Sequence, residues 1–358
     1  MMANMNQTNG FKNNLATSGS NKPVVALTLG DPAGIGAELI AKLLAQADTC
    51  SLANIVLVGD PWLWAQGQAL AGVTIATQPH TDFASVRQRL NTDSAAFIVM
   101  DTVKASEIQT SQASAAGGAS VLQVLNACMD AAKLQQIDAI CFAPLNKFAM
   151  KQGGLQFEDE LHHFAHYMGV DTYFCEFNTL GNLWTARVSS HIPLKMAASF
   201  ISQERIIEAT QLIDRSLKAS GNPLPKIAVA GFNPHNGDGG TCGREEIDII
   251  APAVAALKLK GISVDGPFPA DTIFLKARAG EYQAVVTMYH DQGQIAIKLM
   301  GFSQGVTVQG GLPVPITTPA HGTAYDIAGK GVANVDATRN AFNIAASMGR
   351  SLMSESHQ

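Results

Sequence analysis

Short apolar runs recur along the chain and alternate with segments of helical periodicity. The apolar runs predict buried strands at residues 24–29, 55–59, 96–99, 139–142, 184–189, 227–230 and 284–288. The periodic segments predict helices at residues 37–45, 120–133, 201–218 and 245–259. Because strands alternate with helices, we expect an α/β fold with a mostly parallel sheet and helices on both of its faces.

Glycine-rich and proline-rich segments follow several of these strands. Residues 30–36, GDPAGIG, join the first strand to the first helix, where backbone N–H groups can be aimed at an anion. Their spacing is not GxGxxG, so a standard dinucleotide fingerprint is missing and an ordinary tight turn is an equally simple interpretation. Residues 266–272, GPFPADT, are expected to form a loop.

Three histidines share one context, because His191, His235 and His290 each directly follow a predicted strand. Any one of them alone is more often an ordinary polar residue. Three imidazoles with an open fourth position suit a catalytic divalent metal, which can polarise a substrate hydroxyl group and stabilise the oxyanion. Asp271 and Asp291 are candidates for a further ligand or for orienting an imidazole.

A segment dense in acids and histidines lies at residues 157–166, FEDELHHFAH. It is predicted to open a helix, because acidic residues are favoured in a first helical turn. His162 and His166 are four positions apart and share one helical face, so they are a second candidate metal pair. A solvated helix face is the simpler interpretation of that pair.

Composition narrows the classes of protein to consider. The chain has 358 residues, 47% hydrophobic and 15% charged, which suits a well-packed α/β protein with a sizeable core. Its net charge of −5 argues against a general nucleic-acid binder, and no apolar run approaches the roughly 20 residues of a membrane span. Residues 1–22 are polar, lack the apolar centre of a signal peptide and are predicted to be a disordered tail.

The cysteines are scattered and odd in number, and none belongs to a CxxC motif. They are Cys50, Cys128, Cys141, Cys175 and Cys242. This pattern predicts a reduced, cytoplasmic protein in which the cysteines are small core residues.

Six motifs between Gly30 and Asn334 carry a resemblance to a known family. They read GDPAGIGAELI, SHIPL, GFNPHNGDGGTCGREEID, DGPFPADTIF, MYHDQG with Lys298, and HGTAYDIAGKGVAN. Through them the chain resembles the 4-hydroxythreonine-4-phosphate dehydrogenase family of vitamin B6 (pyridoxine) biosynthesis. The last motif is also similar to the nucleotide loop of isocitrate and isopropylmalate dehydrogenases.

The resemblance implies a two-domain fold like that of isocitrate and isopropylmalate dehydrogenases, with a cleft between the domains. It also implies a homodimer in which the cleft is completed by the partner subunit and the metal site is shared. The expected nucleotide-binding domain comprises residues 23–145 plus 286–358. Residues 146–285 are then the domain for metal, substrate and dimerisation.

The resemblance also implies the reaction and the site residues. The family oxidises a secondary alcohol with NAD or NADP and then releases a β-carboxylate as carbon dioxide. The implied metal ligands are His191, His235 and His290, for zinc, magnesium, manganese or cobalt. Lys298 and Asp271 are the implied catalytic residues, although Lys298 also reads as an ordinary helix-surface lysine. The implied cofactor-binding residues within the loop at 311–334 are Gly311, His321, Gly322, Thr323, Asp326 and Asn334.

Departures from the family pattern bear on the substrate. The family has Gly-His-Thr where this chain has Asp159-Glu160-Leu161, and asparagine and arginine where it has Thr307 and Ile316. Arginine binds phosphate well through paired hydrogen bonds. This chain has isoleucine in place of that arginine and additional acidic residues in the Asp159-Glu160-Leu161 segment. Both changes predict an unphosphorylated substrate. The predicted substrate-contacting residues are Glu160, Leu161, Lys298, Thr307 and Ile316. After a small shift of the alignment, His162 or His163 takes the place of the missing family histidine.

We therefore expect a metal- and NAD(P)-dependent dehydrogenase of a hydroxy acid, with decarboxylation. One alternative is a true 4-hydroxythreonine-4-phosphate dehydrogenase. Another is a cis-dihydrodiol carboxylate dehydrogenase, because the dihydrodiol dehydrogenases of terephthalate breakdown are similar to this family. A non-catalytic regulator would bind metal and ligand without turnover, and an acyl or phosphoryl transferase would bind no nicotinamide nucleotide.

Overall fold

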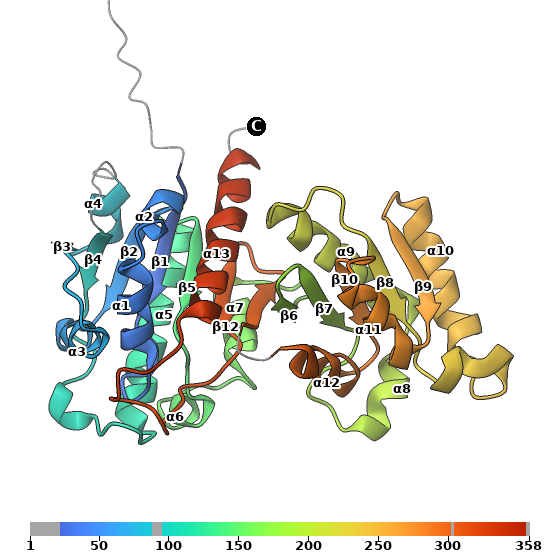
Figure 1. The fold of residues 1–358 in the computed structure, drawn as a ribbon, viewed down its shortest axis with the longest axis horizontal. Helices are drawn as coiled ribbons and strands as arrows, with labels where there is room; N and C mark the ends of the chain where they lie inside the picture. The colour runs from blue at the N-terminus through green and yellow to red at the C-terminus, as the bar shows by residue number, and fades with distance from the viewer. Residues whose placement is uncertain (1–21, 88–94, 302–303, 356–358) are drawn as a thin grey trace, which may run out of the picture.

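The computed structural model describes residues 22–87, 95–301 and 304–355 (Figure 1). The strands of the described part are β1 (Val24–Thr28), β2 (Asn54–Gly59), β3 (Thr77–His80), β4 (Ala95–Val99), β5 (Ala139–Phe142), β6 (Cys175–Leu180), β7 (Leu183–Arg187), β8 (Ile227–Ala230), β9 (Val264–Phe268), β10 (Ala284–Thr287), β11 (Val306–Gly310) and β12 (Ile316–Pro319). The predicted tail lies outside the described residues, apart from Lys22.

The helices begin and end as follows. They are α1 (Gly36–Leu44), α2 (Thr49–Leu52), α3 (Pro61–Ala71), α4 (Phe83–Arg87), α5 (Ala115–Lys133), α6 (Lys147–Gln152), α7 (Glu160–Met168), α8 (Ala197–Phe200), α9 (Gln203–Ala219), α10 (Ala251–Leu259), α11 (Ala270–Arg278), α12 (His290–Met300) and α13 (Asp336–Glu355), with 3-10 turns η1 (Ala105–Glu107), η2 (Leu194–Met196) and η3 (Pro234–Gly240) and a π-helical turn η4 (Glu246–Ile250).

Within the described residues, a 12-stranded sheet has the order β3-β4-β2-β1-β5-β12-β11-β6-β7-β10-β8-β9. Neighbouring strands are parallel except at β12–β11, β11–β6 and β6–β7, where they are antiparallel. The predicted α/β class with a mostly parallel sheet is confirmed. The sheet is continuous between its two parallel parts (Figure 1), and the predicted division into two domains stays a prediction.

Helices cover both faces of the sheet because side chains alternate along its buried strands. On β1, Val25 and Leu27 belong to the core that includes α1 and α3, whereas Val24 and Ala26 belong to the core that includes α5. Both sets are almost fully buried. Burial on both faces explains why this strand reads as a continuous apolar run.

The seven predicted strands and the helices at 37–45, 120–133 and 201–218 are all present, shifted by a few residues at their ends. The predicted helix at 245–259 is present as η4 followed by α10. The loop predicted at 266–272 is wrong, because β9 and α11 occupy it. Among the described strands, β9 pairs with β8 alone and lies at the edge of the sheet. An edge strand tolerates the prolines that suggested a loop.

Two other predictions concern burial and membranes. Cys128 and Cys141 are buried as predicted, but Cys242 is exposed, which corrects the expectation that all cysteines are core residues. None of the helices in the described ranges has the length and apolar character needed to cross a membrane.

Candidate functional site

A pocket of about 310 Å³ lies where the start of α12 and the segments after β5 and β12 meet the central strands. Its lining includes six residues predicted from the sequence, namely Glu160, His290, Lys298, Thr307, His321 and Gly322. The motif after β10 and the glycine-punctuated loop after β12 therefore contribute to one cavity. Leu161 and Ile316 are buried in the core, and their predicted contact with substrate stays a prediction.

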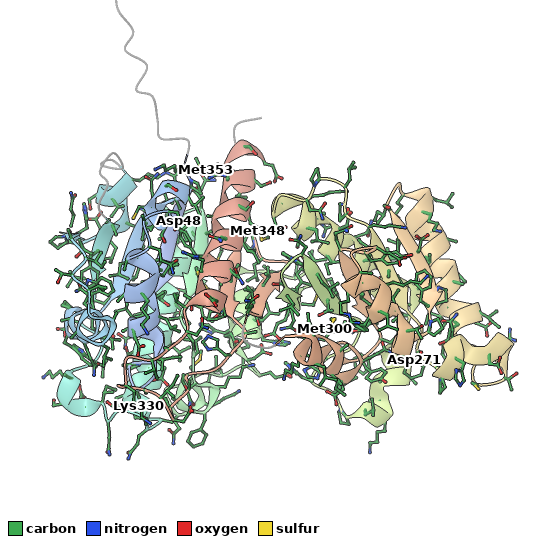
Figure 2. All side chains as sticks on the ribbon, viewed as in Figure 1. Asp48, Asp271, Met300, Lys330, Met348 and Met353 are labelled. Carbon is green, nitrogen blue, oxygen red and sulfur yellow. The ribbon has the colours of Figure 1, made fainter. Side chains whose placement is uncertain are left out.

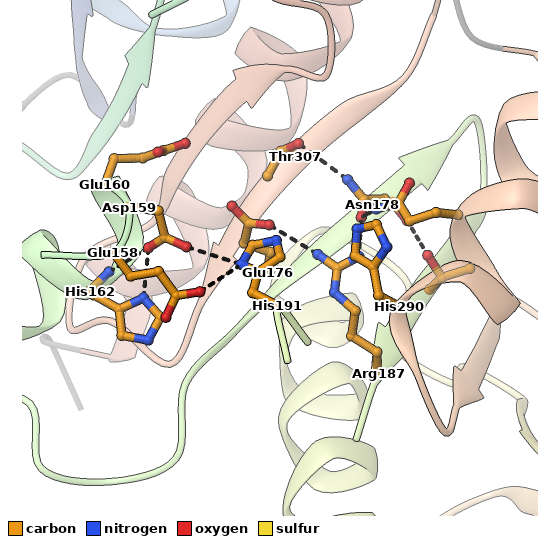
Figure 3. Close-up of polar contacts among 12 residues, drawn as sticks. Glu158, Asp159, Glu160, His162, Glu176, Asn178, Arg187, His191, His290 and Thr307 are labelled. Atoms are coloured by element: carbon orange, nitrogen blue, oxygen red, sulfur yellow. Dashed lines mark hydrogen bonds and ion pairs between the residues drawn. The ribbon is translucent and has the colours of Figure 1, made fainter. Parts of the chain in front are cut away.

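His191 lies beside two acidic side chains at the start of α7. Its Nδ1 is 3.4 Å from Glu158 Oε1 and 3.4 Å from Asp159 Oδ2. One donor atom from each of these three residues lies within 4.8 Å of the others. The His191 and His290 rings are also close, with centroids 5.6 Å apart (Figure 3). Imidazole nitrogens and carboxylate oxygens are the donors that zinc, manganese and cobalt accept, so this set fits a divalent metal.

Hydrogen bonds stabilise the ionised form of the Asp159 carboxyl group. Burial alone would raise the pKa of Asp159, but hydrogen bonds with His191 and with the backbone N–H and ring of His162 hold that pKa well below its ordinary value. In return, the hydrogen bond to Asp159 raises the pKa of His191. Asp159 is therefore a carboxylate at neutral pH. It also caps α7, since its Oδ1 accepts the N–H of His162 at 3.0 Å.

His235 is placed differently from the other two predicted ligands. It is exposed on η3. The metal-ligand group found in the described residues contains His191 but neither His235 nor His290, although the His290 ring lies beside the ring of His191. Residues 235–239 all have positive φ, from 44° to 79°. Buried Glu246 holds the start of this loop, because its Oε1 accepts the N–H groups of Phe232 and Asn233 at 2.7 Å each.

The remaining predicted ligands have varied surroundings. Asp291 Oδ1 is 2.7 Å from His290 Nδ1, the contact expected of a carboxylate that orients an imidazole. Asp271 is exposed in the first turn of α11 (Figure 2). His162 hydrogen-bonds Asp159, whereas His166 lies against the Phe157 ring at 4.7 Å. These separate contacts do not support the candidate pair of His162 and His166.

The glycine turn at residues 30–36 packs against the loop after β12. The N–H of Ile35 donates to Thr323 O at 3.2 Å, and the Tyr325 hydroxyl donates to Asp31. A Cβ on Gly34 would lie 2.9 Å from Thr323 Cβ, so only glycine permits this approach. The glycine turn at residues 30–36 and the loop after β12, which are distant in the sequence, are therefore in direct contact.

The end of this loop is fixed by α1. Glu38 is buried, and its Oε1 accepts the N–H of Ala333 at 2.8 Å. Lys42 pairs with Glu38 at 2.7 Å and donates to the carbonyls of Gly331 and Ala333. These contacts hold the backbone that leads to Asn334.

Three more residues were predicted to bind the cofactor, and each has different surroundings. Asn334 Oδ1 accepts the N–H of Asp336 at 2.7 Å where α13 begins. Gly311 has φ of 91° directly after β11, and Asp326 is exposed. Binding of a nucleotide by these residues stays a prediction.

Several residues of the pocket lining were not predicted from the sequence, among them Lys147, Glu176, Asn178 and Gln294. Glu176 and Asn178 alternate with apolar positions along β6, and this period of two was the available signal. Lys147 Nζ lies 3.5 Å from Glu160 Oε2. Burial raises the pKa of Glu160, Lys147 opposes the change, and the nearby Glu176 charge adds to it.

Comparison with known proteins identifies the family. Residues 51–345 match the family model described as "Pyridoxal phosphate biosynthetic protein PdxA". The chain belongs to this family and is a dehydrogenase-type oxidoreductase. It is 51% identical over 335 residues to "Putative 4-hydroxythreonine-4-phosphate dehydrogenase 2" of Pseudomonas aeruginosa, covering 92% of this chain and 97% of that protein.

Two solved structures show the same fold. The 4-hydroxythreonine-4-phosphate dehydrogenase of Klebsiella pneumoniae has a TM-score of 0.78 and 33% identity, covering 92% of this chain and 98% of that one. The terephthalate 1,2-cis-dihydrodiol dehydrogenase of Burkholderia xenovorans has a TM-score of 0.63 and 26% identity, covering 89% and 98%. The predicted resemblance to both groups is confirmed.

Proposed function

We propose that this protein oxidises a secondary hydroxyl group of an unphosphorylated hydroxy acid, with NAD or NADP as hydride acceptor, and that decarboxylation follows. The observation that carries the proposal is the shared pocket. It places His290 and Lys298 of α12 on one lining with His321 and Gly322, which begin the expected nucleotide loop. A dehydrogenase requires substrate and nicotinamide to meet in this way.

The metal-binding residues we propose are His191 and His290, with Glu158 and Asp159 beside His191. A divalent metal bound there would polarise the oxygens of the substrate and favour loss of the hydroxyl proton. His235 is proposed to act from the partner subunit in a homodimer, since it is exposed and apart from that group. Its rigid loop would present the imidazole outward.

Lys298 is proposed to neutralise the substrate carboxylate. It is exposed on α12 and lines the pocket together with Thr307. A lysine ammonium is a flexible point charge that suits a carboxylate, and Thr307 adds a hydroxyl group. Oxidation of a hydroxyl group β to a carboxylate gives a β-keto acid, and loss of carbon dioxide is the expected next step.

Two observations support an unphosphorylated substrate. Glu160 and Glu176 both line the pocket, and carboxylates repel phosphate. Ile316, where the family has arginine, is fully buried in the core. Against them stands the name of the relative from Pseudomonas aeruginosa, which refers to a phosphorylated substrate. A phosphorylated four-carbon hydroxy acid, as in pyridoxine biosynthesis, is therefore the second candidate, and a cis-dihydrodiol carboxylate is the third.

The test is a dehydrogenase assay that follows absorbance of the reduced nicotinamide. Purified protein, NAD or NADP and a divalent metal are combined with 4-hydroxythreonine 4-phosphate, unphosphorylated hydroxy acids or a cis-dihydrodiol dicarboxylate. We expect turnover of unphosphorylated acids that is abolished by His235→Ala. Efficient turnover of the phosphorylated compound would overturn the substrate proposal and leave a vitamin B6 enzyme with a rebuilt pocket.

A further inference from the structure

The central antiparallel strands carry a polar face that the family pattern did not predict. On β6, Glu176 and Asn178 share one face, while Phe177 between them packs against Trp184 in the core. Asn178 is paired with Thr307 of β11 and with Thr185 of β7. Polar side chains from three neighbouring strands thus lie together, and those of β6 and β11 line the pocket.

Arg187 is the centre of this polar face. Its side chain is only 5% exposed, and its guanidinium donates to Glu176 Oε2 and to Asn178 Oδ1 at 2.9 Å each (Figure 3). Its Nε is buried without a hydrogen-bond partner among the described residues. A buried charge is costly unless it is paired, so the contact with Glu176 fixes both side chains.

Asn178 is fixed in one orientation by its neighbours. Its Oδ1 accepts from Arg187 and from the amide of Gln294, and its Nδ2 donates to Thr307 Oγ1 at 3.3 Å. This links Arg187 to both Gln294 and Thr307 in the pocket lining. A network of hydrogen bonds therefore connects the polar side chains on the β6 side of the pocket.

Glu160 brings a second carboxylate to the same pocket, from α7. It is 7% exposed, and its Oε2 has no hydrogen-bond partner among the residues that the structure describes, although Lys147 lies 3.5 Å away. Ionised carboxylates only accept hydrogen bonds, so a ligand that contacts Glu160 and Glu176 must supply donors. A phosphate group supplies negative charge instead.

We propose that Glu176, positioned by Arg187, is a specificity-determining residue that acts with Glu160 to bind hydroxyl or ammonium groups and to reject phosphate. The inference rests on the proposed function, because it names the chemical class of the hydroxy acid. The substrate carries hydrogen-bond donors along its carbon chain in addition to its carboxylate. Neither Glu176 nor Arg187 corresponds to a residue expected from the family motifs.

The test measures ligand binding by calorimetry, with a divalent metal and reduced nicotinamide nucleotide present so that no turnover occurs. The probes are a four-carbon trihydroxy acid, its 4-phosphate and its 4-amino analogue. We expect wild type to bind the trihydroxy or amino compound more tightly than the phosphate. The two unphosphorylated probes distinguish a hydroxyl from an ammonium group.

The decisive variant is Glu176→Gln, which removes the charge and keeps the shape. We expect the ratio of affinities for unphosphorylated over phosphorylated probe to fall about tenfold, because a charge-assisted hydrogen bond and a repulsion are both lost. Arg187→Lys keeps the charge but not the forked contact, and should lower the ratio less. Glu204→Gln changes an exposed glutamate of α9 and should leave the ratio unchanged.

Thermal unfolding of each variant separates a shifted ratio from a misfolded protein, and Arg187→Lys remains informative where Glu176→Gln does not fold. An unchanged ratio in folded Glu176→Gln, or preferred binding of the phosphate by wild type, overturns the inference. If hydroxy acids are turned over but the affinity ratio does not change in Glu176→Gln, the proposed function holds and the inference about Glu176 is wrong. If the affinity ratio changes in Glu176→Gln but hydroxy acids are not turned over, the inference about Glu176 is supported and the proposed function is wrong.

Discussion

The imidazole rings of His191 and His290 lie 5.6 Å apart in the segments that follow two adjacent parallel strands, β7 and β10. Parallel neighbours end at the same edge of a sheet, so residues that are distant in the sequence meet there. Nδ1 of His290 is occupied by Asp291, and Nδ1 of His191 lies next to Asp159 and Glu158.

We expect His191→Ala or His290→Ala to lower the metal content of the purified protein and to reduce kcat by about 100-fold or more, as removal of a metal ligand does. Metal analysis and the dehydrogenase assay measure the two effects. His166→Ala is the matched control, since His166 is exposed and its ring contacts only the Phe157 ring in a tilted arrangement among the ring contacts of the described residues. Full metal content in both ligand variants would refute the proposed centre.

Asp159→Ala should remove both the cap of α7 and the contact with His191. We expect the free energy of unfolding to fall by about 1 kcal/mol from the cap and metal affinity to fall about 10-fold to 100-fold. Denaturant unfolding and metal titration report the two separately. Ser202→Ala removes the cap of α9, where Ser202 Oγ accepts the N–H of Arg205 at 3.2 Å, and should cost stability without changing metal affinity. Equal metal affinities in these two variants would contradict the prediction.

Glu38→Gln should raise the Kd for the nicotinamide nucleotide about tenfold or less, because a charged hydrogen bond to the loop at 331–333 is weakened. Fluorescence titration of NADH measures this change, and metal content should not alter. Asp214→Asn is the control, since Asp214 pairs with Lys218 on α9 with the same spacing and the same distance of 2.7 Å. An unchanged Kd would show that α1 does not position the nucleotide loop.

Glu246 should make stability depend on pH in the acid range. Burial opposes ionisation, but hydrogen bonds from Asn233 and Phe232 hold the pKa of Glu246 below its ordinary value of 4.5. A lowered folded-state pKa stabilises the protein above the ordinary value, and this contribution is lost as pH falls through the lowered pKa. The difference in unfolding free energy between wild type and Glu246→Gln should therefore shrink on acidification below about 4.5.

Denaturant unfolding at several pH values measures this dependence. Glu204→Gln, an exposed substitution, should show no such convergence with wild type. A constant difference between wild type and Glu246→Gln at every pH would indicate that shape and not charge holds the loop of His235.

Local patterns in the sequence predicted much of the fold. Strands buried on both faces, such as β1 and β10, read as apolar runs because every position contacts the core. The strands that were missed are β3, β6, β9, β11 and β12. β6 and β11 present polar side chains to the pocket, and β3 and β9 are the edge strands, so their apolar signal is weak.

The sequence by itself determined the fold class and the family and supplied candidate residues for metal and substrate chemistry, because local patterns and motifs carry this information. Only the tertiary structure decided which residues meet. The ion pair of Glu176 with Arg187, and the approach of His191 to Glu158 and Asp159, depend on strand pairing and on helix packing against the sheet. Such contacts follow from register and chain direction over long separations, which no local pattern specifies.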